Sequence, residues 1–345
     1  MFNNIYKGKK VFVTGYRGFC GSWLSLWLTK LGAKVYGCGH LPNTDPNHYD
    51  LLPSVAHPVG MELLDYPELE GALTLVRPDL IIHLAAKAIV ARTFKEPRKT
   101  FENNIMGAVN ILDAARCCEN LKGIVMVVTD KVYDNREWHW GYREVDTLKG
   151  DDPYSVSKVC VDQITDCYRK CFGLNVAVAR AGNVIGGGDW SYKRLIPDIV
   201  RATAVGEPVI IHTPTATRPF QHVLDALNGY LVLGQKIMEG EDVNRAWNFG
   251  PDESLSVLDI LTIAKRVWPD VEWKYSDEPT HPNMVYLLRL DTTESKKLLN
   301  WKPVWSIKRA VIKSISWYKH YYRSRSVFSE SDITDFEAEV SQRNA

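Results

Sequence analysis

The sequence has no long apolar run and no excess of charge of one sign. Its 345 residues carry 42 Lys and Arg against 41 Asp and Glu. Nucleic-acid-binding proteins usually have a basic patch, and a membrane-spanning helix needs about 20 mostly apolar residues. We therefore expect neither nucleic acid nor a membrane as a partner. Residues 1–6 are polar and aromatic, unlike a signal peptide, which favours a cytoplasmic location.

The sequence also lacks the cysteine spacing of metal sites. None of its seven Cys residues belongs to a C-x-x-C pair, and most lie in stretches with helical spacing. An odd number of such residues is typical of free thiols in a reducing compartment. We therefore expect free thiols and no metal site.

Short apolar runs alternate with amphipathic stretches, with no repeat and no low-complexity linker. We expect strands near 10–14, 34–38, 79–84, 123–129 and 175–180, and helices near 22–31, 66–76, 97–118 and 154–172. This alternation predicts an α/β fold with a doubly wound parallel Rossmann sheet, whose ligand site lies at the carboxyl ends of the strands. Further along, a strand and three helices predict a smaller α/β substrate-binding domain; they are expected near 208–211, 222–238, 255–268 and 306–322.

The same pattern suggests how the chain divides into domains. We predict a dinucleotide-binding domain over residues 1–182, with returning segments near 219–249. Residues 183–218 and 250–325 would form the substrate-binding domain. The polar stretch 326–345 would be a C-terminal arm, either a surface helix or a partly disordered segment.

A glycine-rich turn follows the first expected strand. Gly15, Gly18 and Gly21 have the spacing G-x-x-G-x-x-G and lead into a helix. Glycines at such a turn let backbone N–H groups approach a pyrophosphate at the helix N-terminus, where the helix dipole favours anions. A glycine-rich turn that binds nothing has the same spacing. Arg17 and Phe19 lie in this turn and join the candidate cofactor residues.

Other candidate cofactor residues follow the later strands. Asp65 stands where an adenine contact is expected, and Ala85, Ala86 and Lys87 follow a buried strand. No Asp or Glu ends the second strand, where an acidic residue would select NAD through the ribose 2′-hydroxyl. Since Arg17 could accept a 2′-phosphate, NADP stays open beside NAD.

Tyr154 and Lys158 are four residues apart on an expected helix. Residues at this spacing share one helix face, so the ammonium can lower the phenol's pKa from its usual value of about 10. A Tyr-x-x-x-Lys pair alone is common on amphipathic helices. Here Thr129, Asp130 and Lys131 end the preceding buried strand, which adds an acid and a base close by.

These motifs resemble the extended short-chain dehydrogenase/reductase superfamily. The resemblance rests on residues 14–21 and 83–86, on Thr129 with Asp130, and on Tyr154 with Lys158. Longer stretches are similar to the sugar-nucleotide 4,6-dehydratases, and among them to the branch that acts on CDP-glucose. These stretches are 21–28, 134–144, 180–190, 218–223 and 246–252, and the similarity spans roughly residues 5–320.

The resemblance implies a role for each catalytic candidate. Tyr154 would take the proton of the sugar 4-hydroxyl while hydride passes from C4 to NAD, and Lys158 would hold the cofactor ribose. Asp130 would protonate the departing 6-hydroxyl, Lys131 would act at the C5 proton, and Thr129 would donate to the 4-oxygen. Return of the hydride to C6 would give CDP-4-keto-6-deoxyglucose.

By the same resemblance, Asn183, Arg194 and Arg218 match substrate-facing positions. An Arg fork suits a diphosphate, although each Arg could instead form a structural ion pair. His222 either faces the nucleotide base or caps the following helix. A dehydratase for another nucleotide sugar, a 4-epimerase and a non-catalytic dinucleotide sensor remain as alternatives.

Two positions depart from the family pattern. Lys87 stands where the family has Gln, and Ala91 stands where Arg is common, so the accepted sugar could differ. The expected helices 97–118 and 154–172 carry apolar residues beyond one face, which predicts a homodimer or homotetramer.

Overall fold

A computed structural model describes residues 1–42, 44–276 and 287–344. Its centre is a seven-stranded sheet in the order β11-β6-β5-β4-β1-β2-β3, with every neighbouring pair parallel. The strands are β1 (Lys10–Thr14), β2 (Lys34–Cys38), β3 (His57–Pro58), β4 (Leu80–His83), β5 (Gly123–Val128), β6 (Val176–Ala181) and β11 (Ala246–Phe249). The predicted parallel Rossmann sheet is confirmed.

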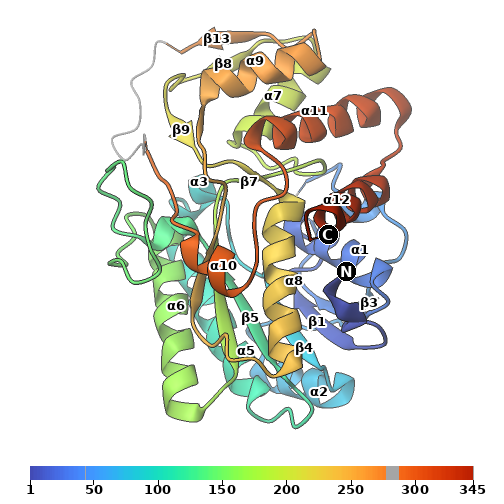
Figure 1. Ribbon diagram of the computed structural model, residues 1–345, viewed down its shortest axis with the longest axis vertical. Coiled ribbons are helices and arrows are strands. Elements are labelled where there is room, and N and C mark those ends of the chain that lie inside the picture. Colours follow the sequence, from blue (N-terminus) through green and yellow to red (C-terminus); the bar gives the residue numbers. More distant parts are fainter. Residues whose placement is uncertain (43, 277–286, 345) are drawn as a thin grey trace.

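Helices cover both faces of this sheet (Figure 1). Neighbouring residues of β1 point to opposite faces, so Val11 and Val13 lie in one buried cluster and Phe12 lies in the other. On the first face pack α1 (Phe19–Lys30) and α8 (Val223–Glu239); on the second pack α2 (Tyr66–Val76), α5 (Gly107–Ala115) and α6 (Pro153–Phe172). Both faces are therefore dry, as the apolar strand sequences require.

The single helix expected over 97–118 is wrong. The chain forms α4 (Pro97–Phe101), a wider π-helical turn (Glu102–Met106) and then α5. Asn104 in the wide turn accepts from the Lys87 backbone N–H at 2.7 Å and donates to Ser157 Oγ at 2.9 Å. These two contacts reach residues far away in the sequence, so the local helical pattern could not show the interruption.

A smaller set of elements lies beyond the carboxyl ends of the sheet, at the top of Figure 1. Three two-stranded pairs form there: β7 (Val184–Ile185) with β10 (Gln221–His222), β9 (Thr217–Arg218) with β12 (Leu255–Ser256), and β8 (Val209–Ile211) with β13 (Trp273–Tyr275). The accompanying helices are α3 (Val90–Thr93), α7 (Leu195–Ala204), α9 (Val257–Val267) and α11 (Ile307–Ser324). The short helix α10 (Thr293–Leu298) packs against β11 of the large sheet. The short helical turns are η1 (Phe2–Asn4), η2 (Tyr49–Leu51) and η4 (Asp130–Val132).

α8 and β11 rejoin the large sheet from within the predicted returning segment 219–249. The domain boundaries themselves stay a prediction. Within the ranges assigned to the second domain and the arm, residues 277–286 and 345 lie outside the described residues. None of the helices over the described ranges is long and apolar enough to cross a membrane.

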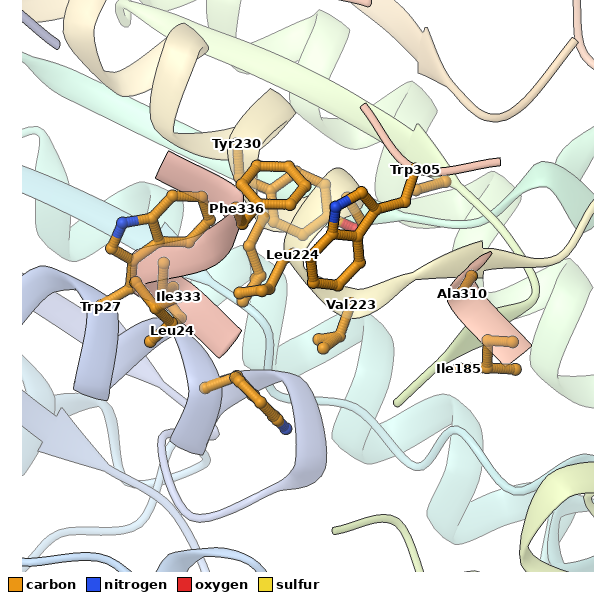
Figure 2. Close-up of a cluster of buried hydrophobic side chains, with 14 of the residues drawn as sticks. Leu24, Trp27, Ile185, Val223, Leu224, Tyr230, Trp305, Ala310, Ile333 and Phe336 are labelled. Atoms are coloured by element: carbon orange, nitrogen blue, oxygen red, sulfur yellow. The ribbon is translucent and has the colours of Figure 1, made fainter. Parts of the chain in front are cut away.

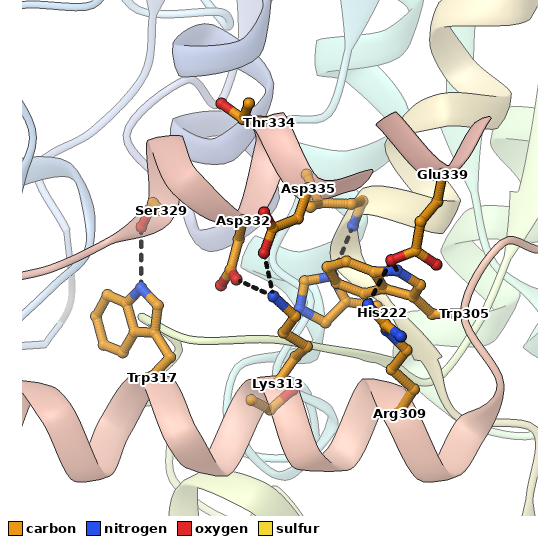
Figure 3. Close-up of polar contacts among 12 residues, drawn as sticks. His222, Trp305, Arg309, Lys313, Trp317, Ser329, Asp332, Thr334, Asp335 and Glu339 are labelled. Atoms are coloured by element: carbon orange, nitrogen blue, oxygen red, sulfur yellow. Dashed lines mark hydrogen bonds and ion pairs between the residues drawn. The ribbon is translucent and has the colours of Figure 1, made fainter. Parts of the chain in front are cut away.

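The predicted arm contains an ordered helix, α12 (Ser329–Asn344). Phe336 is fully buried between two tryptophans (Figure 2). Its ring lies 5.5 Å from that of Trp27 in α1 and 5.2 Å from that of Trp305, which precedes α11. Lys313 of α11 binds Asp332 and Asp335 of α12 (Figure 3). The arm is thus a packed part of the molecule and not only a surface helix.

Candidate active site

The glycine-rich turn lies between β1 and α1 and can hold only glycine at two positions. A Cβ on Gly21 would stand 2.1 Å from the carbonyl oxygen of Gly15. Gly15 itself has φ +72°, and a Cβ there would stand 3.0 Å from the backbone of Ala85. Gly18 is the N-cap of α1 and supplies no side-chain acceptor, so the first amides of this helix remain available to an anion.

Arg17 borders the same turn. Its guanidinium lies over the rings of Tyr16 and Tyr49, and its buried Nε has no partner among the described residues. An unpaired buried donor beside a glycine turn suits an anionic ligand. The cradle and this donor together fit the pyrophosphate of a dinucleotide.

Thr14 ends β1 and organises the loop that follows β4. Its Oγ1 lies 2.9 Å from His83 Nδ1 and accepts from the backbone N–H of Ala85 at 3.1 Å. Ala85 and Ala86 are thereby held against the glycine turn. Burial lowers the pKa of His83 to about 3, so this ring is neutral. That Thr14 holds the loop after β4 was not predicted from the sequence, although its place at the end of a strand was visible.

Asp65 and Lys87 lie at the edges of the predicted cofactor site. The Asp65 side chain caps α2 by accepting from the backbone N–H of Glu68 at 3.1 Å, and its adenine contact stays a prediction. Lys87 is exposed, while its backbone is held by Asn104. Its side chain is therefore free to vary without moving the loop.

Asp130 is the buried acid of the site. It begins the turn η4 directly after β5, is 1% exposed, and accepts from Thr129 Oγ1 at 3.1 Å and from Asn183 Nδ2 at 3.0 Å. Burial raises the pKa of this carboxyl, while the nearby charge of Lys131 opposes the rise. A carboxyl that holds its proton is suited to act as a general acid. Lys131 is exposed on the same turn.

Tyr154 occupies the first turn of α6. Asp152 fixes this helix start with a capping box, accepting from the backbone N–H groups of Tyr154 and Ser155 at 2.8 and 3.0 Å. The Tyr154 hydroxyl shares a hydrogen bond with Thr129, so one threonine connects the phenol and the Asp130 carboxyl. The structure thus brings Thr129, Asp130 and Tyr154 together.

The expected lowering of the Tyr154 pKa by Lys158 is not found. Burial raises the pKa of Tyr154 to about 12, and the opposing charge comes from Arg194. Lys158 is 3% exposed and donates from Nζ to the Val127 carbonyl at 2.9 Å. Burial lowers the pKa of Lys158 to about 8. Loss of solvation is therefore the largest influence on the pKa of both Tyr154 and Lys158.

The predicted substrate residues lie in different surroundings. Asn183 touches Asp130 directly. Arg194 lies 3.6 Å from the Asp189 carboxylate and 3.5 Å from the Ala88 carbonyl, and its charge reaches Tyr154. Arg218 donates to the Thr217 carbonyl at 2.8 Å, and its charge reaches Asp130. Both guanidinium groups are thus close to the acid and the phenol.

His222 does not face the site. It is 1% exposed, its ring lies 4.6 Å from that of Trp305, and its Nδ1 accepts from the Leu224 backbone N–H at the start of α8 (Figure 3). Of the two alternatives that the sequence left open, the structure shows the helix cap. The proposed contact with the base is wrong because Trp23 and Trp305 enclose the ring.

The order of the strands, the glycine turn and the Tyr154–Lys158 helix define a dinucleotide-dependent enzyme fold. Residues 11–250 match the NAD dependent epimerase/dehydratase family, and the chain belongs to that family. It is 37% identical to the CDP-glucose 4,6-dehydratase of Salmonella typhimurium, over 96% of this chain and 97% of that one. It is 29% identical to the dTDP-D-glucose 4,6-dehydratase of Dictyostelium discoideum, over 73% of this chain and 60% of that protein.

Solved structures agree on the fold. The UDP-glucose 4-epimerase of Thermotoga maritima superposes with a TM-score of 0.80 at 23% identity, covering 90% of this chain and 98% of that one. No cluster of three potential metal ligands occurs within residues 1–42, 44–276 and 287–344.

Proposed function

We propose that this protein is a nucleotide-sugar 4,6-dehydratase that converts CDP-glucose into CDP-4-keto-6-deoxyglucose. The observation that carries the proposal is the shared contact of Thr129 with the Tyr154 hydroxyl and the buried Asp130 carboxyl. Such an arrangement puts a proton acceptor and a proton donor on one substrate. A 4-epimerase needs the phenol but has no use for an acid at the sugar 6-position. The 37% identical relative supports the choice of CDP-glucose.

NAD is the cofactor that this site would hold, and when bound it supplies the acceptor and later the donor of the hydride. NADP remains the alternative. The residues that would hold the cofactor are Gly15, Arg17, Gly18, Phe19, Gly21, Asp65, Ala85, Ala86, Lys87, Tyr154 and Lys158.

The chain's own groups then move the protons. Tyr154 takes the proton of the sugar 4-hydroxyl as the phenolate, a form that burial disfavours and the charge of Arg194 favours. Thr129 Oγ1 donates to the 4-oxygen. Lys131, as the neutral amine, takes the C5 proton, which the 4-keto group makes acidic, and a proton adds again at C5 after the hydride has returned to C6. Asp130 gives its proton to the 6-oxygen, which leaves as water. The raised pKa of Asp130 suits this last role because the acid must be protonated before it acts.

Two further features belong to the proposal. Asn183, Arg194 and Arg218 would bind the nucleotide diphosphate and the sugar. The second is a homodimer or homotetramer, which would cover Met106 at the end of the wide turn and Phe172 at the end of α6, now 45% and 51% exposed. The enzyme would act in the cytoplasm, in deoxysugar and polysaccharide (O-antigen) synthesis.

The test is incubation of the pure protein with CDP-, dTDP-, GDP- and UDP-glucose in heavy water. We expect CDP-glucose to lose one water, to gain solvent deuterium at C5, and to carry its C4 hydride at C6. A product that differs from the substrate only at C4 would show an epimerase instead. Water loss from another nucleotide sugar and not from CDP-glucose would keep the reaction class and reject the substrate.

A further inference from the structure

The turn that follows β6 shapes the space in which the Asp130 carboxyl lies. A Cβ on Gly182 would stand only 1.9 Å from the Asp130 carboxyl carbon, so glycine leaves the space that the carboxyl fills. The next residue, Asn183, has φ +49° and donates from Nδ2 to Asp130 Oδ2 at 3.0 Å. The position of this turn therefore decides where the acid points.

Gln221 of β10 holds that turn from behind. Its backbone N–H donates to the Asn183 carbonyl at 3.2 Å, and its side-chain Nε2 donates to the Gly182 carbonyl at 3.1 Å. The same Nε2 donates to the Phe249 carbonyl at the end of β11 at 2.8 Å. Gln221 is 2% exposed, and its amide thus links the ends of β6 and β11.

The amide of Gln221 is an unusual choice for this position. Its Oε1 is buried and has no partner within the described residues, although such an acceptor costs free energy when it is left unpaired. An apolar side chain would avoid that cost but would leave the Gly182 and Phe249 carbonyls without this donor. The side-chain amide therefore has a structural role, because its N–H groups hold the Gly182 and Phe249 carbonyls in place.

We propose that Gln221 is a positioning residue for the loss of water: it fixes the Gly182–Asn183 turn, and Asn183 then aims the Asp130 carboxyl at the 6-oxygen. The inference rests on the proposed dehydratase function. Tyr154 is positioned from α6 by the Asp152 cap and reaches the Asp130 carboxyl only through Thr129, so the oxidation at C4 should depend much less on Gln221 than the loss of water does. The two half-reactions should separate when the amide is removed.

The test replaces the amide by a side chain of similar length without donors, Gln221→Met. We expect reduced cofactor to form at the normal rate, and water loss to slow by about 10- to 100-fold, the effect of misplacing a catalytic group by about 1 Å. KM for CDP-glucose should stay unchanged while kcat falls. The pKa of the acid in the pH profile of water loss should rise, because Asn183 no longer favours the ionised form.

Gln235→Met on α8 is the matched control and should behave like the unaltered protein, since within the described residues the Gln235 side chain bonds only to Glu239. Equal slowing of both half-reactions in Gln221→Met, or unchanged water loss, would overturn the proposal. If Gln221→Met does not fold, Asn183→Ala decides. A loss of the elimination step that exceeds the slowing of cofactor reduction supports the inference, and equal slowing of the two half-reactions rejects it. An unaltered protein that removes water from no nucleotide sugar would instead reject the proposed function.

Discussion

Arg180 and Asp162 form a two-pronged ion pair beneath the site, with Nε–Oδ2 and Nη2–Oδ1 distances of 2.8 and 2.9 Å. The side chains are only 4% and 6% exposed. Arg180 Nη1 also donates to the Tyr133 hydroxyl at 3.0 Å and to the Glu144 carbonyl at 2.8 Å. One guanidinium thus joins β6, the helix of Tyr154 and the segment that follows Asp130.

Arg180→Ala should lower the free energy of unfolding by about 3–5 kcal/mol, because it leaves the buried Asp162 carboxylate without its partner. Urea unfolding followed by far-UV circular dichroism would measure this change. Arg116→Ala is the control. Arg116 pairs with Asp113 on the surface, where the side chains are 43% and 35% exposed, so its removal should change the free energy of unfolding much less than that of Arg180. Equal losses for the two variants would contradict the buried network.

Asp130→Asn should separate oxidation from elimination. The amide keeps the shape of the carboxyl but has no acidic proton, so reduced cofactor should accumulate while water loss slows by about 10² to 10⁴. Because the pKa of Asp130 is raised, water loss by the unaltered enzyme should fall as the pH rises through that pKa. The variant should lack this limb of the profile. Tyr154→Phe should abolish both steps, and normal dehydration by Asp130→Asn would mean that the carboxyl is structural.

His48→Gln should change how stability depends on pH. His48 is 2% exposed between Ser22 and Ser329, and burial lowers its pKa to about 3. The unfolded residue takes up a proton below about pH 6.5, whereas the folded ring stays neutral. The contribution of His48 is therefore full above pH 6.5 and is lost as the pH falls from about 6.5 towards 3.

The measurement is the free energy of unfolding at several pH values across that interval. The difference between the unaltered protein and His48→Gln should shrink by about 1.4 kcal/mol per pH unit as the pH falls. The exposed His57 supplies the control variant, His57→Gln, which is measured at the same pH values. A constant difference for His48→Gln would show that its ring accepts a proton in the folded state.

Lys87→Gln introduces the residue that the family resemblance led us to expect at this position. Lys87 is exposed and its backbone is held by Asn104, so the loop should stay in place. We expect kcat/KM for CDP-glucose to stay within about twofold or to improve, as for other surface changes. Lys95→Gln on the same exposed segment is the control. Loss of turnover with cofactor binding intact would mean that this enzyme uses a different sugar.

The sequence revealed what depends on local spacing. The buried strands and the glycine turn were predictable because the apolar runs are local and a Cβ on Gly21 would meet Gly15, only six residues away. The Tyr154–Lys158 spacing predicted the helix that the structure shows as α6, and the catalytic role of the two residues stays a proposal. The pKa of Tyr154 could not be predicted in the same way, because burial by the whole fold outweighs the neighbour four residues away.

Long-range contacts account for the other misses. The wide turn at Asn104 depends on residues 87 and 157, and the enclosure of His222 depends on Trp23 and Trp305. Gln221 gave no signal at all, since its importance comes from carbonyl groups at the ends of two strands. The hydrophobic periodicity of a single segment does not reveal contacts between residues that are far apart in the sequence.

The contact of α12 with α1 has a consequence for synthesis on the ribosome. Trp27 donates to Glu337, which lies 310 residues later in the chain. If synthesis adds about 5–20 residues per second, roughly 15 to 60 s pass between the synthesis of Trp27 and that of Glu337. Until then the outer side of Trp27 has neither Glu337 nor the ring of Phe336. The nucleotide-binding half of a nascent chain therefore reaches its final packing only after translation has passed residue 337.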